Sequence, residues 1–544
     1  PFPIITAKEK LTYNRNFEGI ARKLEKAVTT RADDEAAEED KNAYTKYFMY
    51  QPCEQCGGTR LNERARNVKL NGLAISDVCR LELVDVLTFL QNINDEISKP
   101  ILRKAQFLLQ QLVEIGVGYL SLDRSVSTLS GGESQRVKMS KQMDCNLVDM
   151  LYVLDEPTIG LHPRDTENLM NILFRLKEKG NSVFVVEHDP DIIRAAEWII
   201  DIGPKAGKYG GSVVYNGEPG GLQNTDSLTG AWLREKSKPT FKRKQGTSFF
   251  EINNATSNNL KNVSVKIPKG VLTCVTGVAG SGKSSLIHEC FAKQHPGAIV
   301  IDQSPIGKSS RANAATFIGV FDLIRKEFAT ATHSEASLFS FNSKGACPKC
   351  NGQGVLTFEL HFLDSVKTLC DECEGKRYHS EVLEQKFNGK NISEVLDMTV
   401  NQACEFFDSS KIKKHLFLLQ EVGLGYLKLG QSLSTLSGGE SQRLKIATEL
   451  KKEGNIYIMD EPTTGLHMSD IENFYKIVKT LVKNDNTVII IEHNLDIIKY
   501  ADWIIDLGPE GGKKGGEVLF QGLPEDIVHC EQSVTGKYVR NVIS

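Results

Sequence analysis

A glycine-rich run at residues 277–284 has the spacing of a phosphate-binding loop. It follows an apolar stretch at 271–276 and precedes a stretch typical of a helix. Glycines let successive backbone N–H groups wrap phosphate oxygens, and the positive end of the following helix adds to the attraction. We expect Lys283 to reach the terminal phosphates of a nucleotide and the Ser284 hydroxyl to ligate Mg²⁺. The predicted phosphate-binding residues are Gly277, Gly280, Ser281, Gly282, Lys283, Ser284 and Ser285.

An acidic pair follows an apolar, strand-like stretch twice in the chain. In the second copy we expect Asp460 to hold Mg²⁺ through water and Glu461 to polarise the attacking water as general base. His493 ends the next apolar run, where it can sense the terminal phosphate, and we predict Glu461 and His493 to be catalytic. The first copy offers the same set at the same spacing, namely Asp155, Glu156 and His188.

The string Leu-Ser-Gly-Gly-Glu also occurs twice, beginning at residues 129 and 436. Serine and glycine N–H groups at a helix start form an anion site. The string resembles the signature motif of ATP-binding-cassette (ABC) ATPases, a family in which the signature of one cassette covers the ATP held by the other. Gln303 resembles the glutamine that completes the Mg²⁺ shell in that family. This resemblance assigns Ser130, Gly131, Gly132 and Glu133 to the ATP on Lys283, and Ser437, Gly438 and Gly439 to a second composite site with Asp155, Glu156 and His188.

Four cysteines have the arrangement of a structural zinc site. Two Cys-x-x-Cys pairs, at 347–350 and 370–373, are separated by 19 residues, within the usual interval for four thiolates on one Zn²⁺. A closed thiolate set leaves no position for an activated water, so we interpret the metal as architectural. The predicted ligands are Cys347, Cys350, Cys370 and Cys373, with Cys53 and Cys56 forming half of a further zinc site.

The duplicated motifs predict the organisation of the chain. We expect an α/β fold with two ABC-type P-loop cassettes in tandem, each carrying an inserted helical signature domain and a zinc module. The expected segments are 1–130 (remnant of the first signature and zinc insertion), 131–235 (second half of the first cassette), 236–247 (linker), 248–304 (start of the second cassette), 305–436 (second signature domain with its zinc module) and 437–544 (end of the second cassette).

Composition restricts the class of protein. The chain has 544 residues, 40% of them hydrophobic and 25% charged, with a net charge of −3. It is therefore long enough for several domains, and any nucleic-acid surface must be local. The apolar runs are too short for a membrane helix and no signal peptide is visible, so we expect a cytoplasmic protein.

Further strings resemble the UvrA family, the ABC-type ATPases of nucleotide excision repair. Zinc pairs between phosphate loop and signature are foreign to transporter cassettes, and the resemblance extends over residues 301–307, 339–342, 465–467 and 506–512. It implies a homodimer that binds damaged double-stranded DNA, detects lesions by deformation, and uses ATP to load a partner helicase subunit of the excinuclease. It also assigns DNA contacts to Lys308, Arg311, Asn313 and Thr316, although the run at 308–314 departs from the family's arginine- and proline-richer pattern.

Other interpretations stay open at this point. A UvrA-like protein conferring resistance to DNA-intercalating antibiotics would share these motifs. A transporter cassette is disfavoured by the zinc pairs, and a purely architectural DNA-binding module would not need two hydrolytic carboxylate sets. Because no phosphate loop and no further cysteine pair precede Cys53, we expect that an N-terminal segment carrying a phosphate loop, two zinc ligands and the partner-binding insertion is absent from this sequence.

Overall fold

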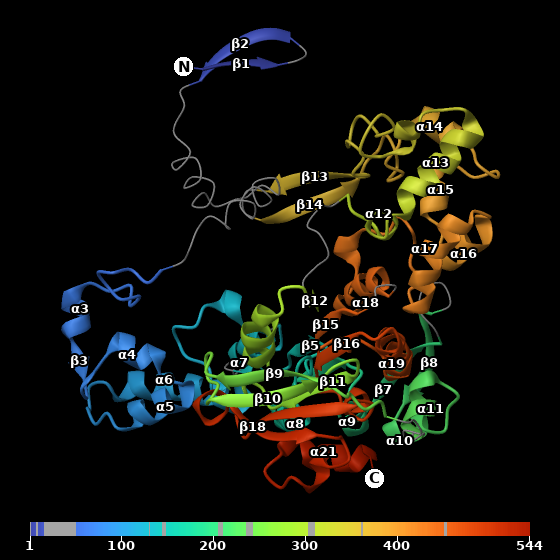
Figure 1. The fold of residues 1–544 in the computed structure, drawn as a ribbon. Helices are drawn as coiled ribbons and strands as arrows, with labels where there is room; N and C mark the ends of the chain where they lie inside the picture. Colours follow the sequence, from blue (N-terminus) through green and yellow to red (C-terminus); the bar gives the residue numbers. More distant parts are fainter. Residues whose placement is uncertain are drawn as a thin grey trace. The chain divides into compact units, whose positions relative to one another are not determined.

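The computed structural model describes residues 2–6, 9–15, 51–129, 131–143, 148–204, 210–234, 243–302, 311–360, 363–450 and 454–543. The chain divides into two compact units, residues 1–76 and 77–544. This division falls inside the predicted segment 1–130, and the predicted domain boundaries remain predictions. Figure 1 shows the elements along the chain.

The first unit contains short elements. Strands β1 (Phe2–Thr6) and β2 (Glu9–Arg15) pair as an antiparallel hairpin. Helix α3 (Glu63–Asn67) follows, and β3 (Lys69–Leu70) pairs with β4 (Leu73–Ala74). The Asn62 side chain accepts a hydrogen bond from the Ala65 N–H and so caps α3, as asparagine commonly does at this position.

A six-stranded sheet organises the second cassette, in the order β12-β15-β16-β11-β17-β18. The strands are β11 (Leu272–Gly277), β12 (Ile299–Ile301), β15 (Ile456–Asp460), β16 (Thr487–Ile491), β17 (Trp503–Gly508) and β18 (Glu517–Gly522). All neighbours are parallel except β17 and β18. Parallel strands are covered on both faces, which explains why every residue of β11 and β16 is buried.

The sheet arrangement places the predicted chemistry at one edge. The carboxyl ends of parallel strands meet on the same side of a sheet, where α/β proteins bind ligands. The phosphate loop follows β11, the acidic pair follows β15, and His493 follows β16. The α/β class predicted from the repeated motifs is confirmed.

The remaining elements of the second cassette follow on both sides of the phosphate loop. Strands β9 (Phe249–Ala255) and β10 (Val263–Pro268) form an antiparallel pair before it. Helix η4 (Ser285–Ala292) comes directly after it. Later in the chain come α18 (Gly438–Glu449), α19 (Met468–Lys483), α20 (Leu495–Ile498) and α21 (Val534–Ile543).

In its described residues, 311–360 and 363–437, the signature domain between β12 and α18 consists of helices and one hairpin. Its helices are α12 (Ala314–Phe317), α13 (Val320–Thr332), α14 (Ser380–Glu384), α15 (Ile392–Leu396), α16 (Val400–Phe406) and α17 (Ser410–Glu421). The hairpin is β13 (Val355–Leu360) with β14 (Leu363–Leu369). Capping boxes start α15 and α16, each satisfying two backbone N–H groups at a helix start.

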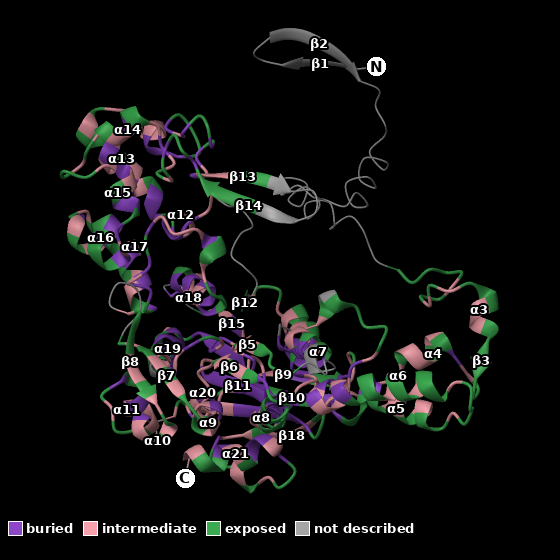
Figure 2. Ribbon diagram, turned by 180° about the vertical axis from the view of Figure 1, so that it is seen from behind, coloured by how far each residue is buried: buried purple, intermediate pink, exposed green. Residues whose placement is uncertain are grey.

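The first cassette repeats this architecture in part. It begins with the helices α5 (Leu83–Gln91), α6 (Lys99–Leu112) and α7 (Gly131–Met143). Its strands are β5 (Leu151–Asp155), β6 (Ser182–Val186), β7 (Ile199–Gly203) and β8 (Ser212–Gly217). Helix α8 (Pro163–Glu178) lies between β5 and β6 in the chain, α9 (Pro190–Ala195) between β6 and β7, and α11 (Leu228–Arg234) after β8. Within the described part of the chain, β5 pairs with β6 and β7 with β8, as two separate sheets. Their residues alternate between exposed and half-buried in β5, β6 and β7, unlike the fully buried strands β11 and β16 (Figure 2).

Candidate nucleotide site and metal centre

The phosphate loop begins with a glycine that no other residue could replace without rearrangement. Gly277 has a φ of 131°, and a Cβ there would lie 2.0 Å from the backbone oxygen of Leu507 on the neighbouring strand. Positive φ together with this close approach requires glycine. The loop that follows can therefore turn sharply from β11 into η4.

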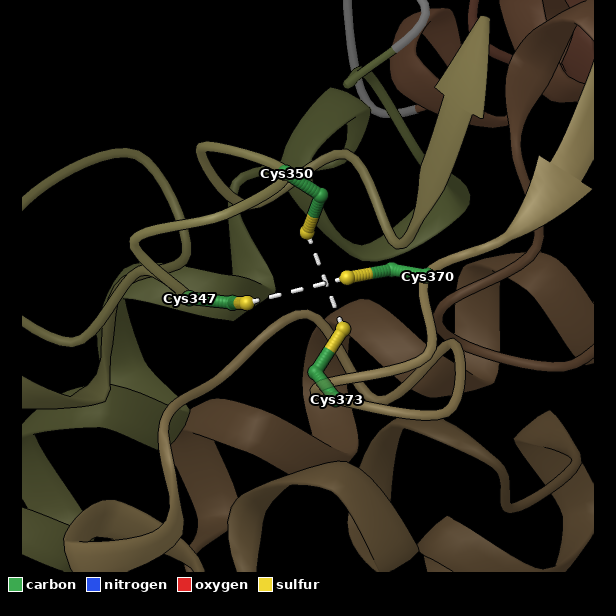
Figure 3. Close-up of side chains that lie close together, drawn as sticks. All are labelled: Cys347, Cys350, Cys370 and Cys373. Atoms are coloured by element: carbon green, nitrogen blue, oxygen red, sulfur yellow. Dashed lines mark hydrogen bonds between the residues drawn. The ribbon is translucent and has the colours of Figure 1, made fainter.

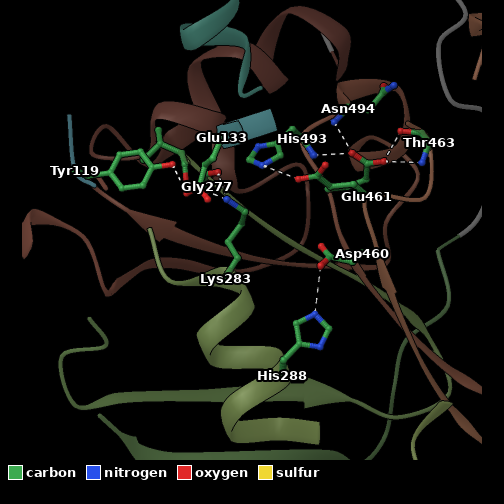
Figure 4. Close-up of polar contacts among 12 residues, drawn as sticks. Tyr119, Glu133, Gly277, Lys283, His288, Asp460, Glu461, Thr463, His493 and Asn494 are labelled. Carbon is green, nitrogen blue, oxygen red and sulfur yellow. Dashed lines mark hydrogen bonds and ion pairs between the residues drawn. The ribbon is translucent and has the colours of Figure 1, made fainter. Parts of the chain in front are cut away.

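Lys283 lies inside this loop. Its Nζ donates to the backbone oxygens of Gly277 and Val278, each at 2.9 Å (Figure 4). Burial lowers the pKa of Lys283 to about 8, while the carboxylates of Glu461 and Asp460 favour its charged form. A buried ammonium group that donates to carbonyl oxygens can instead donate to phosphate oxygens, which are stronger, anionic acceptors.

The acidic pair combines a strand-end carboxylate with a strained backbone. Asp460 ends β15, and its Oδ2 lies 3.4 Å from the Nε2 of His288 on η4. Glu461 has a φ of 43°, and Glu156 in the first cassette has a φ of 44°. Non-glycine residues rarely adopt this left-handed conformation, and such strain gathers at functional sites. Both copies therefore hold the second carboxylate in the same unusual orientation.

His493 is buried next to the predicted general base. Its Nε2 lies 4.0 Å from Glu461 Oε1, and burial lowers its pKa far below the usual value, so the imidazole is neutral. Glu492 holds the turn, since its carboxylate accepts hydrogen bonds from the backbone N–H groups of His493 at 2.6 Å and Asn494 at 2.9 Å. It also accepts from the backbone N–H of Thr463, directly after the acidic pair and Pro462. Glu492 thus joins the two turns that carry the catalytic candidates.

The signature helix of the first cassette is connected to this phosphate loop through Tyr119. Its hydroxyl donates to Glu133 Oε1 at 2.7 Å, and Arg124 Nη2 lies 3.2 Å from Glu133 Oε2. The Tyr119 ring packs on the phosphate loop, because a Cβ on Gly280 would lie 2.7 Å from it. Figure 4 shows Tyr119 and Glu133 next to Gly277 and Lys283 of the loop. The structure therefore brings the first signature to the second phosphate loop.

The second set of predicted residues is arranged similarly. Glu156 Oε1 lies 3.7 Å from His188 Nε2, and a Cβ on Gly465 would lie 3.3 Å from Glu156 Oε2. Ser437 caps α18 in a capping box with Glu440, while Gly438 and Gly439 begin that helix. A cavity of about 710 Å³ lies between the cassettes, lined by both acidic turns and by His188 and His493.

Some predicted site residues take a different role or fall outside the described ranges. Ser130, Gln303 and Lys308 lie outside the described residues, and Gly131 and Gly132 begin α7. The DNA contacts predicted for Asn313 and Thr316 remain predictions, and in this structure the two side chains lie at a helix start. The Asn313 side chain is fully buried and forms a capping box with Thr316 at the start of α12. Arg311 is half-buried.

The four predicted zinc ligands converge at the base of the β13–β14 hairpin (Figure 3). The Sγ atoms of Cys347 and Cys370 lie 3.9 Å apart, and those of Cys350 and Cys373 lie 3.6 Å apart. A tetrahedral site with Zn–S bonds of about 2.3 Å has sulfur–sulfur separations of about 3.8 Å. All four side chains are buried, so the donor set and its spacing fit Zn²⁺.

In the first unit, Cys53 and Cys56 lie in a turn of the same kind. The Gly57 N–H donates to the Cys53 oxygen at 2.7 Å, as the Glu374 N–H donates to the Cys370 oxygen at 2.7 Å. The Cys53 side chain is exposed. The turn has the local form of a metal-binding pair, and its metal binding stays a prediction.

Sequence reasoning missed three residues of the nucleotide site. Tyr119, His162 and His288 each contact a predicted site residue or its immediate neighbours. The repeat contained a signal for two of them, since Tyr426 and His467 occupy the matching positions of the second copy. Tyr426 likewise donates to the signature glutamate of its own cassette, Glu440, at 2.6 Å.

These features define an ATP-binding-cassette protein, and a family model described as "ABC transporter" matches residues 260–464. The crystal structure of UvrA2 from Deinococcus radiodurans superposes with a TM-score of 0.89 at 39% identity, covering 96% of this chain and 69% of that one. The chain belongs to the UvrA family. UvrABC system protein A from Vibrio cholerae is 44% identical over 97% of this chain, and that from Aquifex aeolicus is also 44% identical over 97%.

The chain spans about 60% of the length of these curated relatives. No helix in the described ranges has the length and apolar character needed to cross a membrane.

The phosphate-loop geometry predicts that Lys283→Ala abolishes ATP turnover by this chain. The substitution removes a positive charge from the transferring phosphate, and we expect a loss of about 100-fold or more, as for other transition-state donors. Steady-state phosphate release measures the effect. Lys293→Ala, at the exposed end of the same helix, is the matched control and should retain turnover. Turnover in Lys283→Ala close to that of the unmodified chain would place the hydrolytic site elsewhere.

The cysteine cluster predicts that Cys370→Ser releases one equivalent of zinc and lowers the melting temperature, because a structural zinc site contributes folding energy directly. Elemental analysis and thermal unfolding measure these effects. Cys404→Ser on α16 removes a thiol that is not in the cluster and should keep the metal. Equal zinc contents in the two variants would contradict the assignment.

Proposed function

We propose that this chain is the ATP-hydrolysing DNA-damage sensor of nucleotide excision repair. It binds distorted duplex DNA and couples ATP binding and hydrolysis to loading of a partner helicase subunit, while excision belongs to partner subunits. The observation that carries the proposal is the connection of the first signature helix to the second phosphate loop through Tyr119, in a chain 44% identical to UvrABC system protein A. The protein acts as a cytoplasmic homodimer.

The proposed reaction uses the residues at the sheet edge. Lys283 and the N–H groups of residues 277–285 bind the phosphates, and Ser284, Asp460 and Gln303 are the groups that would hold Mg²⁺. Magnesium there neutralises charge on the phosphates when bound. Glu461 orients the attacking water and accepts its proton, and neutral His493 donates a hydrogen bond toward the terminal phosphate. The first signature, Ser130 to Glu133, covers the nucleotide from the other side.

The proposed DNA contacts are local. With a net charge of −3, the chain needs a concentrated basic surface to hold a duplex. Of the predicted contact residues, Arg311 is the described one whose side chain is charged and not fully buried, and Lys308 is the other charged candidate. Lesion recognition then rests on the lower cost of deforming a damaged duplex. The alternative function, resistance to DNA-intercalating antibiotics, is not favoured, because the curated relatives cited above are named as UvrABC system proteins.

If Arg311 contacts phosphate, Arg311→Ala should weaken binding to undamaged and ultraviolet-damaged duplexes alike. The slope of log K against log salt concentration should fall by about one unit, since one counterion fewer is released. Preference for damaged DNA should persist because it depends on deformability. Titrations of both duplexes at several salt concentrations test this.

Lys537→Ala on α21, which removes an exposed lysine outside both signature domains, is the control and should leave the slope unchanged. An unchanged slope in Arg311→Ala would move the DNA surface elsewhere on the molecule. Absence of any preference for damaged duplex in the unmodified chain would contradict the proposed function itself.

A further inference from the structure

The turn after each acidic pair carries a histidine whose side chain contacts the opposite cassette. His162 follows the first pair, and its Nε2 lies 3.2 Å from Thr535 Oγ1 on α21 of the second cassette. His467 follows the second pair, and its Nε2 lies 3.1 Å from Thr229 Oγ1 on α11 of the first cassette. The same contact is thus made twice, once in each direction.

The contact made by His162 continues to the phosphate loop. The Thr535 hydroxyl donates to Asp506 Oδ1 at 2.8 Å, and the Thr276 hydroxyl donates to the same oxygen at 2.8 Å. Ser533 donates to Asp506 Oδ2 at 2.6 Å. Thr276 is the residue immediately before Gly277, where the phosphate loop begins. Hydrogen bonds therefore run without interruption from His162 to the strand that carries the loop.

The hydrogen positions in this chain follow from its partners. The Thr535 hydroxyl has one hydrogen, and Asp506 accepts it, so the Nε2 of His162 must carry the hydrogen it shares with Thr535. His162 Nδ1 accepts the Arg164 N–H at 3.2 Å and thereby caps α8 of the first cassette. Both ring nitrogens have fixed and different roles, and only the neutral tautomer with hydrogen on Nε2 satisfies both.

The surroundings of His162 support the same state. The side chain is 1% exposed, and burial lowers its pKa to about 3, with the positive charges of Lys283 and Arg164 acting in the same direction. Its ring packs edge-on against that of His493, with centroids 6.0 Å apart and an interplanar angle of 89°. The first cassette thus contributes a neutral ring that touches the predicted phosphate-sensing histidine of the second.

We propose that His162 is a positioning residue, supplied by the first cassette, for the ATP site built on Lys283 in the second. It connects the start of α8 to the phosphate-loop strand through Thr535 and Asp506, in a position next to His493. The nucleotide on Lys283 thereby changes the stability of α8, and α8 in turn sets the geometry of hydrolysis. This inference rests on the proposed ATP hydrolysis only for its effect on turnover.

Two substitutions separate the roles of the two ring nitrogens. His162→Asn keeps an oxygen at the position of Nδ1, so α8 remains capped, but its side chain is too short to reach Thr535. His162→Gln places an amide N–H at the position of Nε2 and keeps the donor to Thr535 while losing the cap. Thr535→Val breaks the same link from the other side. Each His162 variant removes one hydrogen bond of the chain, whereas Thr535→Val removes two, the bond from His162 and the bond to Asp506.

The first measurement is ATP turnover. We expect His162→Asn to lower kcat about tenfold with little change in KM, His162→Gln to retain most of kcat, and Thr535→Val to lower kcat at least as much as His162→Asn. The double variant His162→Asn with Thr535→Val should lose no more than Thr535→Val alone, since Thr535→Val already breaks the link that His162→Asn breaks. His415→Asn on α17, outside the nucleotide site, is the matched control and should retain kcat. Equal losses in His162→Asn and His162→Gln, or additive losses in the double variant, would overturn the proposal.

The second measurement does not depend on hydrolysis. Hydrogen exchange of the α8 amides is followed with and without a non-hydrolysable ATP analogue in the full chain. The analogue should protect residues 164–178 in the unmodified chain and in His162→Gln, and should not protect them in His162→Asn. Protection that persists in His162→Asn would overturn the inference. A chain that shows this coupling but hydrolyses no ATP would contradict the proposed function and leave the inference standing.

Discussion

The nucleotide site depends on the position of β11 between β16 and β17. Its parallel pairing with both strands brings the phosphate loop, the acidic turn and His493 to one edge of the sheet. The strand is fully buried, so its polar side chains need partners. Thr276 finds one in Asp506 on β17, directly across the register. Asp506 also accepts from Ser533 and Thr535, so this carboxylate joins β11 to the C-terminal helix next to the loop that must hold its shape.

Burial also sets the electrostatics of the site. Lys283 is buried near the carboxylates of Asp460 and Glu461. In each cassette the turn that carries the histidine after the strand is held by a glutamate, Glu187 or Glu492, that accepts several backbone N–H groups. In a low-dielectric interior these charges interact strongly, and an arriving phosphate group is offered a preformed arrangement of donors. The left-handed backbone at Glu156 and Glu461 belongs to this arrangement, because it fixes the carboxylate that follows each strand. Strain at matching positions of both copies indicates a common requirement of the reaction geometry.

The parts of the site that could be predicted from sequence are those encoded by short, continuous motifs. The phosphate loop, the acidic pairs and the four cysteines each combine residue types whose chemistry follows from their spacing, and the sheet edge and the sulfur cluster bring them together as expected. Tyr119 and His162 belong to no such short motif with known chemistry, because the residues that give them a role, Gly280 and Thr535, lie far away in the sequence. Asn313 has a role that the sequence did not indicate. The resemblance assigns it a DNA contact, which stays a prediction, and the structure shows it as a buried helix cap, because asparagine serves both purposes and burial is not visible in the motif.

The four-cysteine cluster and the two histidine contacts between the cassettes each hold a short element in place. The hairpin of β13 and β14 has two strands, and an isolated two-stranded hairpin is only marginally stable. The four cysteines at its base are placed to anchor it to the signature domain. The two cassettes in turn contact each other through short turns rather than through a shared sheet. His162 and His467 fix those turns by hydrogen bonds whose donors and acceptors permit one arrangement of hydrogens. Each histidine stands at the start of a helix in its own cassette and contacts a threonine in the first turn of a helix in the other. Each contact therefore joins two helix starts, one from each cassette.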